Sequence, residues 1–171
     1  MGTPTLDGEK GYSTLERRWA RPTLDVNGMY GGFTGKGAST IIPAKVSAKV
    51  SMRLVPDQNF EKISKAFDQA VMNNAPKGVK VEVHTHSACA PYAAPIDSPG
   101  MKAAAEAVTK GFGKPPFFIR EGGTLPILPL FKQVLGADSL MLGFCMPECN
   151  AHGPNEFFHI SDLHNGSKTA A

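Results

Sequence analysis

Hydrophobic and polar positions alternate along two stretches in the first half of the chain. Residues 23–30 alternate, and a longer alternation over residues 41–55 places valine, alanine, methionine and leucine on one face. Successive side chains of a strand point to opposite sides of a sheet, so each stretch predicts a half-buried β-strand. The glycine-dense residues 31–37 predict a hairpin connection, and Pro56 ends the second strand because proline cannot donate to a ladder.

A helical period follows this pair of strands. Asp57 predicts the N-cap of a helix whose apolar residues recur between positions 60 and 71, and residues 79–86 return to strand alternation. The order strand, strand, helix, strand is typical of helices that cover one face of an antiparallel sheet. Residues 1–22, rich in Gly, Thr, Pro and charge, predict an irregular lead-in.

In the second half of the chain, helical periods alternate with short apolar runs. Ser98 predicts the N-cap of one helix, residues 125–135 predict a second, and another begins at Ile160. The apolar runs 117–119 and 139–144 predict short buried strands of a largely parallel sheet. We therefore predict an α/β fold class: an antiparallel sheet with helix over residues 1–90, then an α/β part over residues 91–171.

The composition of the chain limits the classes of protein to which it could belong. The 171 residues are 42% hydrophobic and 19% charged, which allows one globular domain or a larger and a smaller one. The net charge of +3 is small and its cations are scattered, so no nucleic-acid partner is expected. No apolar run reaches the ~20 residues of a membrane span. Three cysteines do not make a disulfide framework and favour a reducing cytoplasm.

Polar residues follow the two predicted short strands, at 120–124 and at 150–156. Ligands of α/β sheets bind beyond the carboxyl ends of strands, which makes both stretches candidates for a site. Gly122 and Gly123 could turn backbone N–H groups toward an anion, although a tight turn before a helix explains them as well. His152 in the second stretch is by itself equally consistent with an ordinary hydrogen-bonding histidine.

Two groups of histidine and cysteine residues deserve comparison with metal sites. Cys145, Cys149 and His152 are zinc-ligand types, but the spacing Cys-x3-Cys-x2-His supplies only three donors, which favours an incidental role for the thiols. His84 and His86 would share one face of a strand, and exposed strand histidines are the commoner case. Nothing in the sequence places a thiol beside a group that would activate it.

Four segments, taken in order and at their separations, resemble one family: residues 38–45, 51–56, 120–126 and 150–156. They resemble the zinc-dependent exopeptidases of the carnosinase, cytosolic non-specific dipeptidase and aminoacylase group, from about Gly11 to Ala171. The resemblance implies an α/β catalytic domain and an inserted lid, a four-stranded antiparallel sheet with two helices that forms the dimer. Residues 1–90 look like the second half of that lid, and residues 91–171 like the C-terminal part of the catalytic domain.

The resemblance also implies roles for individual residues. His152 matches the last zinc ligand of a two-metal site, and Arg53 matches the lid arginine that grips the free carboxylate of the substrate. Thr40 matches a lid residue that reaches substrate across the dimer interface, while Gly123 and Thr124 match a turn that contacts the same carboxylate. The implied partners are a small peptide or acyl-amino acid and a second copy of the chain.

The sequence lacks several residues that the family uses for catalysis. The family's other zinc ligands, its bridging aspartate, its glutamate base and its lid histidine have no counterpart in these 171 residues. Cys145 and Cys149 stand where relatives carry glycine and acidic residues. We expect the C-terminal part of a metal-dependent dipeptidase, inactive on its own. The alternatives are a non-catalytic dimerisation or binding module, and a zinc module built from Cys145, Cys149 and His152.

Overall fold

The computed structural model describes residues 4–121 and 125–171. The chain divides into two compact units, the first comprising Met1–Pro91 with Arg120–Pro126 and the second Tyr92–Ile119 with Ile127–Ala171. The assignment of residues 1–90 to a lid and residues 91–171 to a catalytic domain stays a prediction.

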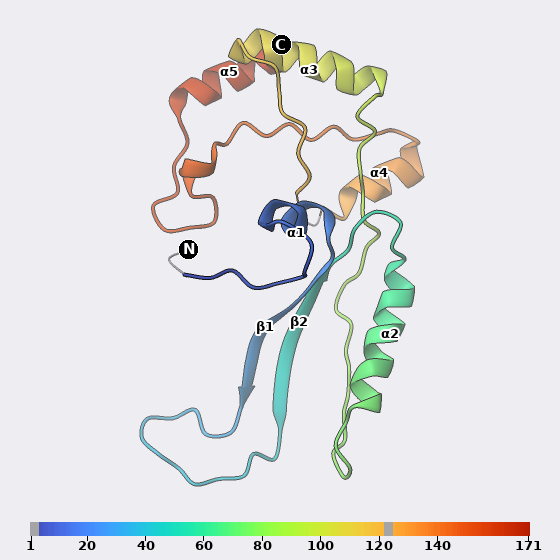
Figure 1. Cartoon of the computed structure of the whole chain (residues 1–171), viewed down its shortest axis with the longest axis vertical. Coiled ribbons are helices and arrows are strands. Elements are labelled where there is room, and N and C mark those ends of the chain that lie inside the picture. The colour runs from blue at the N-terminus through green and yellow to red at the C-terminus, as the bar shows by residue number, and fades with distance from the viewer. Residues whose placement is uncertain (1–3, 122–124) are drawn as a thin grey trace. The chain divides into compact units, whose positions relative to one another are not determined.

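The first unit contains an antiparallel hairpin of β1 (Thr23–Gly31) and β2 (Val46–Arg53), drawn in Figure 1. β1 extends one residue beyond the predicted 23–30, and β2 is shorter than the predicted 41–55. The prediction of a half-buried face was wrong, because most side chains of both strands, including Val46 and Ala48, are exposed. The pairing shifts by one residue between Val26 and Gly28, which makes Asn27 the extra residue of a β-bulge. The hairpin places the start of β1 opposite the end of β2.

A short helix, α1 (Thr14–Ala20), precedes the hairpin, so the prediction of an irregular lead-in was wrong for these residues. Its first turn is closed by a capping box. The Ser13 backbone N–H donates to Glu16 Oε2 at 2.6 Å, and the Glu16 backbone N–H donates to Ser13 Oγ at 3.3 Å. The Ser-x-x-Glu pattern was present in the sequence as the signal for this helix.

The helix after the hairpin, α2 (Phe60–Asn73), begins later than predicted. Asn59 is the N-cap, because its Oδ1 accepts from the Lys62 backbone N–H at 2.9 Å. Asp57, the predicted cap, instead adopts a left-handed conformation with φ of 70° in the turn after β2. Both residue types cap helices well, so only the path of the turn decides between them.

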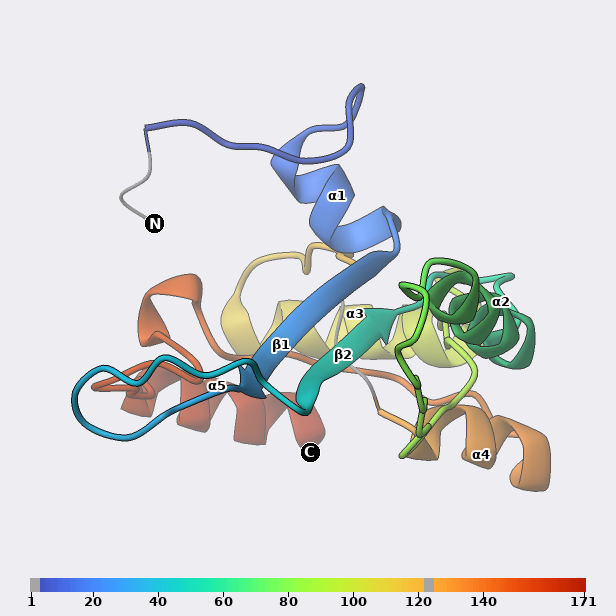
Figure 2. The same ribbon diagram turned by 90° about the horizontal axis from the view of Figure 1, so that it is seen from below.

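Residues 79–86, predicted as a strand, form an extended segment without ladder hydrogen bonds. Figures 1 and 2 show this segment beside α2, and Ser64 and Thr85 hydroxyls lie 3.4 Å apart between the two. Val81 and Val83 are half-buried while Glu82 is exposed, so the predicted alternation of faces is present. The alternation determines which side chains face inward, but a strand also needs a partner backbone at ladder distance.

The helices of the second unit agree with the sequence pattern. They are α3 (Pro99–Phe112), α4 (Ile127–Leu135) and α5 (Ile160–Ala170), with a single 3₁₀ turn, η1 (Pro147–Cys149). Ser98 is the N-cap of α3 as predicted, accepting from the Met101 N–H at 3.2 Å. Gly113 ends α3 in a left-handed conformation with φ of 70°, a conformation that costs glycine nothing sterically.

The packed centre of the second unit lies where α3 meets α5. A Cβ atom at Gly111 would stand 2.7 Å from the Asn165 carbonyl oxygen, and one at Gly166 would stand 2.9 Å from the Phe144 ring. The Phe112 and Phe144 rings stack with centroids 5.5 Å apart. The two glycines therefore allow the helices and the ring to approach closely.

The runs 117–119 and 139–144, predicted as buried parallel strands, are extended but unpaired, so that prediction was wrong for the described residues. Phe117 is 91% exposed. The second run is anchored by Tyr92, whose hydroxyl accepts from the Ser139 N–H at 2.8 Å and donates to the Ser139 carbonyl at 3.1 Å. Apolar composition made these segments strand-like, but parallel pairing needs neighbouring strands that they do not find within the described residues.

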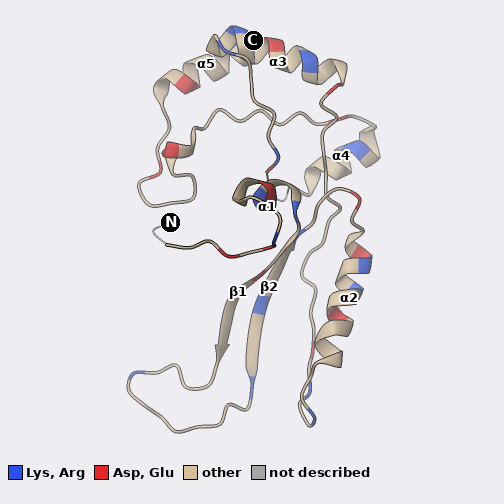
Figure 3. Ribbon diagram, in the orientation of Figure 1, with Lys and Arg blue, Asp and Glu red and all other residues tan. Residues whose placement is uncertain are grey.

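Charged side chains are dispersed over the helices, with both signs interspersed, as Figure 3 shows. Among the described residues no helix has the length and apolar character needed to cross a bilayer.

Candidate functional site

Arg53, the predicted carboxylate-gripping residue, is the last residue of β2 and is exposed. The turn after it is tied down, because the Val55 N–H donates to Gln58 Oε1 at 3.0 Å and the Gln58 N–H donates to the Val55 carbonyl at 3.2 Å. The pairing of β2 fixes the backbone of Arg53. Its guanidinium can then bind a carboxylate through two parallel hydrogen bonds.

Thr40, the second predicted contact, lies in the connection between β1 and β2 and is exposed. A hydrogen bond of 3.2 Å from the Ile41 N–H to the Ser39 carbonyl makes Thr40 the central residue of a tight turn. Figure 1 shows this connection at the end of the hairpin away from Arg53. The structure therefore presents the Thr40 hydroxyl on a loop rather than on a strand.

Thr40 and Arg53 are separated by the length of β2. A strand rises about 3.3 Å per residue, so the seven steps from Val46 to Arg53 cover roughly 23 Å. Within one chain these two residues are not brought together at a single small carboxylate.

Glu121 borders the third predicted contact, the turn that contains Gly123 and Thr124. Those two residues lie outside the described residues, but Glu121 before them forms a bidentate pair with Arg18 of α1. Arg18 Nε and Nη2 reach Glu121 Oε1 at 3.0 and 2.8 Å, and Nη2 reaches Oε2 at 2.9 Å. The partners are 103 residues apart in sequence, so no local pattern could predict this contact.

His152, the predicted metal ligand, lies exposed in a loop that closes on itself. The Phe157 N–H donates to the Cys149 carbonyl at 3.1 Å across the loop base, and the Gly153 N–H donates to the Asn150 carbonyl at 2.8 Å inside it. Asn150, His152 and Asn155 all have positive φ, at 55°, 64° and 57°. Such conformations are uncommon outside glycine and concentrate in functional loops.

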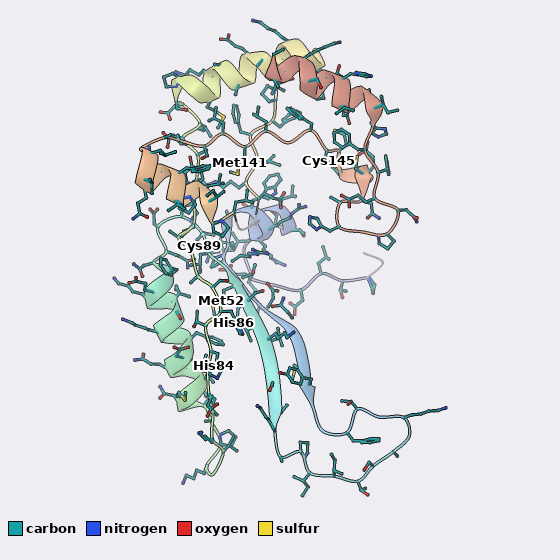
Figure 4. The ribbon with its side chains drawn as sticks, turned by 180° about the vertical axis from the view of Figure 1, so that it is seen from behind. Met52, His84, His86, Cys89, Met141 and Cys145 are labelled. Carbon is teal, nitrogen blue, oxygen red and sulfur yellow. The ribbon has the colours of Figure 1, made fainter. Side chains whose placement is uncertain are left out.

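Two of the thiols lie at the base of this loop. Cys149 ends η1 and is fully buried, whereas Cys145, labelled in Figure 4, precedes η1 and is exposed. A hydrogen bond with Cys149 raises the pKa of the Cys145 thiol, and the charges of Glu156 and Asp162 act in the same direction. Each of these neighbours disfavours a thiolate at Cys145.

The described residues contain no group of three or more His, Cys, Asp or Glu side chains arranged to hold a metal ion. Cys145, Cys149 and His152 are thus not gathered into a zinc module, and His152 alone does not fit a metal site.

His84 and His86 lie on the extended segment that follows α2, as labelled in Figure 4. The His84 side chain is 74% exposed, with its Nε2 3.8 Å from Glu82 Oε2. Lys80 Nζ lies 2.6 Å from the same carboxylate, and this contact, followed by His84, lowers the pKa of Glu82. The arrangement is a solvated charge cluster, as expected for surface histidines.

Comparison with known proteins identifies relatives of the chain. Residues 4–79 match the model of the peptidase dimerisation domain of the M20 group. Over 98% of its length the chain is 37% identical to the Cys-Gly metallodipeptidase DUG1 of Candida albicans, and over 92% it is 29% identical to human Beta-Ala-His dipeptidase. It covers 35% and 32% of those proteins, so it spans about a third of their length.

The chain also resembles a solved structure of an M20 peptidase. The M20 family metallo-carboxypeptidase Sso-CP2 of Sulfolobus solfataricus superposes with a TM-score of 0.82 at 30% identity, covering 98% of this chain and 38% of that one. The α/β architecture, an antiparallel two-stranded sheet accompanied by helices, is therefore shared with that structure.

Proposed function

We propose that this chain is part of a metal-dependent dipeptidase, because residues 4–79 match the peptidase dimerisation domain of the M20 group and nearly the whole chain is similar to named dipeptidases. Its role is to hold the free carboxylate of a small peptide and to supply one metal ligand. The observation that carries the proposal is the identity to named dipeptidases along nearly the whole chain, 37% over 98% of its length.

Arg53, Thr40 and the turn at Gly123 and Thr124 are the proposed carboxylate contacts. The strand-end position of Arg53 supports this role, since a bidentate donor needs a fixed approach. The roughly 23 Å rise of β2 between the Thr40 connection and Arg53 favours a site shared by two chains. In that site Thr40 of one subunit and Arg53 of its partner meet one substrate, which makes a homodimer the functional unit.

His152 is the proposed metal ligand, and zinc is the metal that the family implies. His152 is exposed on a loop with left-handed backbone conformations, which supports this role because its imidazole is accessible to a metal ion. Further ligands must come from outside this chain, because a single histidine does not assemble a metal site. We therefore expect no dipeptide hydrolysis by the 171 residues alone, with or without added zinc.

The second candidate function is a non-catalytic dimerisation or binding module. The match of residues 4–79 to a dimerisation domain favours it, since dimer formation does not require the metal site. It differs from the first candidate in a measurable way, because it demands neither His152 nor Arg53.

A chimera distinguishes the two candidates. This chain would replace the aligned region of the Candida albicans Cys-Gly metallodipeptidase, and Cys-Gly hydrolysis would be measured after reconstitution with zinc, manganese or cobalt. We expect metal-dependent turnover. Arg53→Lys should raise KM about 10- to 100-fold, because losing a charge-assisted bidentate contact costs about 1.5–3 kcal/mol. His152→Ala should abolish turnover and lower the bound metal.

Lys49→Ala is the matched control, since Lys49 is an exposed cation on the same strand as Arg53. It should leave KM unchanged. A folded, dimeric, metal-loaded chimera without activity would favour the non-catalytic module. Full activity in His152→Ala would contradict the ligand assignment.

A further inference from the structure

The chain contains two Asn-Gly pairs, and the structure holds them in opposite surroundings. Asn27-Gly28 lies in β1, where Asn27 is exposed and is the extra residue of the β-bulge. Asn165-Gly166 lies inside α5, where Asn165 is half-buried and Gly166 is buried. In both pairs the asparagine carboxamide precedes a backbone nitrogen that no side chain shields, because glycine has no Cβ.

The surroundings of Asn27 leave its backbone free to move. The extra residue of a bulge is left out of the ladder, and the ladder is locally disrupted around it. Among the described residues β1 pairs with β2 alone, and eight of the nine residues of β1 are exposed. A two-stranded hairpin is at most marginally stable in water, so β1 opens locally at little cost in free energy.

The surroundings of Asn165 hold its backbone in place. Its carbonyl accepts from the Thr169 hydroxyl at 2.9 Å, and a Cβ atom at Gly166 would stand 2.9 Å from the Phe144 ring. Inside an α-helix each backbone N–H is bonded to the carbonyl four residues earlier. The Gly166 nitrogen is therefore engaged in α5 and is not available to the Asn165 side chain.

We propose that Asn27 is a site of spontaneous covalent modification, at which its carboxamide cyclises onto the Gly28 nitrogen and is converted to aspartate and isoaspartate. The proposal stands on the bulge, on the exposure of Asn27 and on the two-stranded sheet that contains it. It does not depend on the proposed peptidase function.

The chemistry balances in two steps and needs only water. The Gly28 backbone nitrogen attacks Asn27 Cγ, a bond forms between them, and the bond from Cγ to Nδ2 breaks. Ammonia leaves with the proton of the Gly28 N–H, and a five-membered succinimide remains. Water then opens the ring. Attack at Cγ gives aspartate, whereas attack at the backbone carbonyl carbon of Asn27 gives isoaspartate, in which the main chain runs through the former side chain.

Isoaspartate would alter the hairpin at its bulge. The product adds one carbon atom to the main chain of β1 at position 27, and both products add a negative charge. Pairs on one side of the bulge, such as Thr23 with Arg53, are then displaced relative to pairs on the other, such as Tyr30 with Ser47. Any effect on substrate contacts by Thr40 and Arg53 rests on the proposed function, whereas the modification is measured without substrate or metal.

The test is to incubate the full 171-residue chain at mildly alkaline pH and to follow both Asn-Gly pairs over time. Peptide mapping by mass spectrometry, with fragmentation that distinguishes aspartate from isoaspartate, measures each rate. We expect Asn27 to convert about 10-fold or more faster than Asn165, a ratio that corresponds to about 1.4 kcal/mol. In concentrated urea the two rates should become nearly equal, because the fold no longer distinguishes the two pairs.

Gly28→Ala is the matched variant. No atom lies within 4 Å of a Cβ at this position and its φ is not positive, so the substitution is compatible with the hairpin. Its methyl group hinders attack by the nitrogen of residue 28, and conversion of Asn27 should be largely lost over the same period. Conversion of Asn165 should be unchanged.

Three results would overturn the proposal. They are equal rates at the two pairs in the folded chain, an Asn27 that reacts in urea but not in the folded chain, and a Gly28→Ala variant that converts as fast as the parent. The first two are read from the parent sequence, so a variant that fails to fold does not obscure the outcome.

Discussion

Single residues at element ends follow rules that the sequence displays locally. Ser98 begins α3 as its type suggests, and Ser13 with Glu16 begins α1 through a capping box. The choice between Asp57 and Asn59 at the start of α2 was missed, because both side chains cap equally well and the turn after β2 selects one. The alternating pattern predicted that Arg53 lies on a strand, and the structure places it at the end of β2. Its role in binding a carboxylate stays a prediction.

Glu16 makes the start of α1 sensitive to pH. Its hydrogen bond with the Ser13 backbone lowers its pKa from 4.5. A carboxyl whose folded pKa is depressed stabilises the fold above its unfolded pKa, and this contribution is lost as pH falls through the lower folded value.

We therefore expect α1 to fray below about pH 4.5, the unfolded value, and to be intact at pH 6. The amide proton shift of Ser13, followed by NMR, should titrate with the Glu16 carboxyl. In Glu16→Gln, where the side chain still accepts a hydrogen bond but does not ionise, this titration should disappear. A Ser13 amide that is insensitive to pH in the parent chain would contradict the capping box.

Elements pack in ways that depend on a few close approaches. Gly111 lies on α3 where Thr169 and the Asn165 carbonyl of α5 would meet its Cβ. In an isolated helix, alanine is more favourable than glycine by about 1 kcal/mol. Overpacking of a close contact costs about 1–3 kcal/mol, so the tertiary effect should exceed the helical preference.

The sign of the Gly111→Ala effect tests the α3–α5 contact. We expect a lower midpoint of urea unfolding, with a loss of up to about 2 kcal/mol after the helical gain is subtracted. Gly143→Ala is the control, because no atom lies within 4 Å of a Cβ at that position and its φ is not positive. It should leave the midpoint nearly unchanged. A stabilising Gly111→Ala would show that the helices do not pack through this glycine.

At the scale of the whole chain, many large apolar side chains are exposed to solvent. The accessible surface is 14001 Å², whereas two separate compact domains of half the mass would expose roughly 9,800 Å² by surface scaling. Among the described residues the buried apolar side chains are limited to Met101 and Cys149. This surplus does not depend on how the two units are placed. We expect other protein to cover much of this apolar surface in the functional assembly.

We accordingly expect the isolated chain to bind the dye ANS and to unfold over a broad temperature range. With so little buried apolar area, the heat-capacity change should fall below the ~12–15 cal/mol/K per residue of compact domains. Calorimetry measures both quantities. The chimera with the dipeptidase relative serves as the control, because its remaining segments would cover the exposed surface. A sharp two-state transition of the isolated chain with a normal heat-capacity change would contradict this expectation.

The sequence alone determined the α/β class, the hairpin, the helices of the second unit and the resemblance to dipeptidases, because these depend on local periodicity, capping and short motifs. It could not determine whether residues 79–86, 117–119 and 139–144 pair as strands, since pairing requires a second backbone at hydrogen-bonding distance. Nor could it bring Arg18 to Glu121, or separate Thr40 from Arg53 by the length of β2. Those relations arise from contacts between distant segments, and only the tertiary structure decides them.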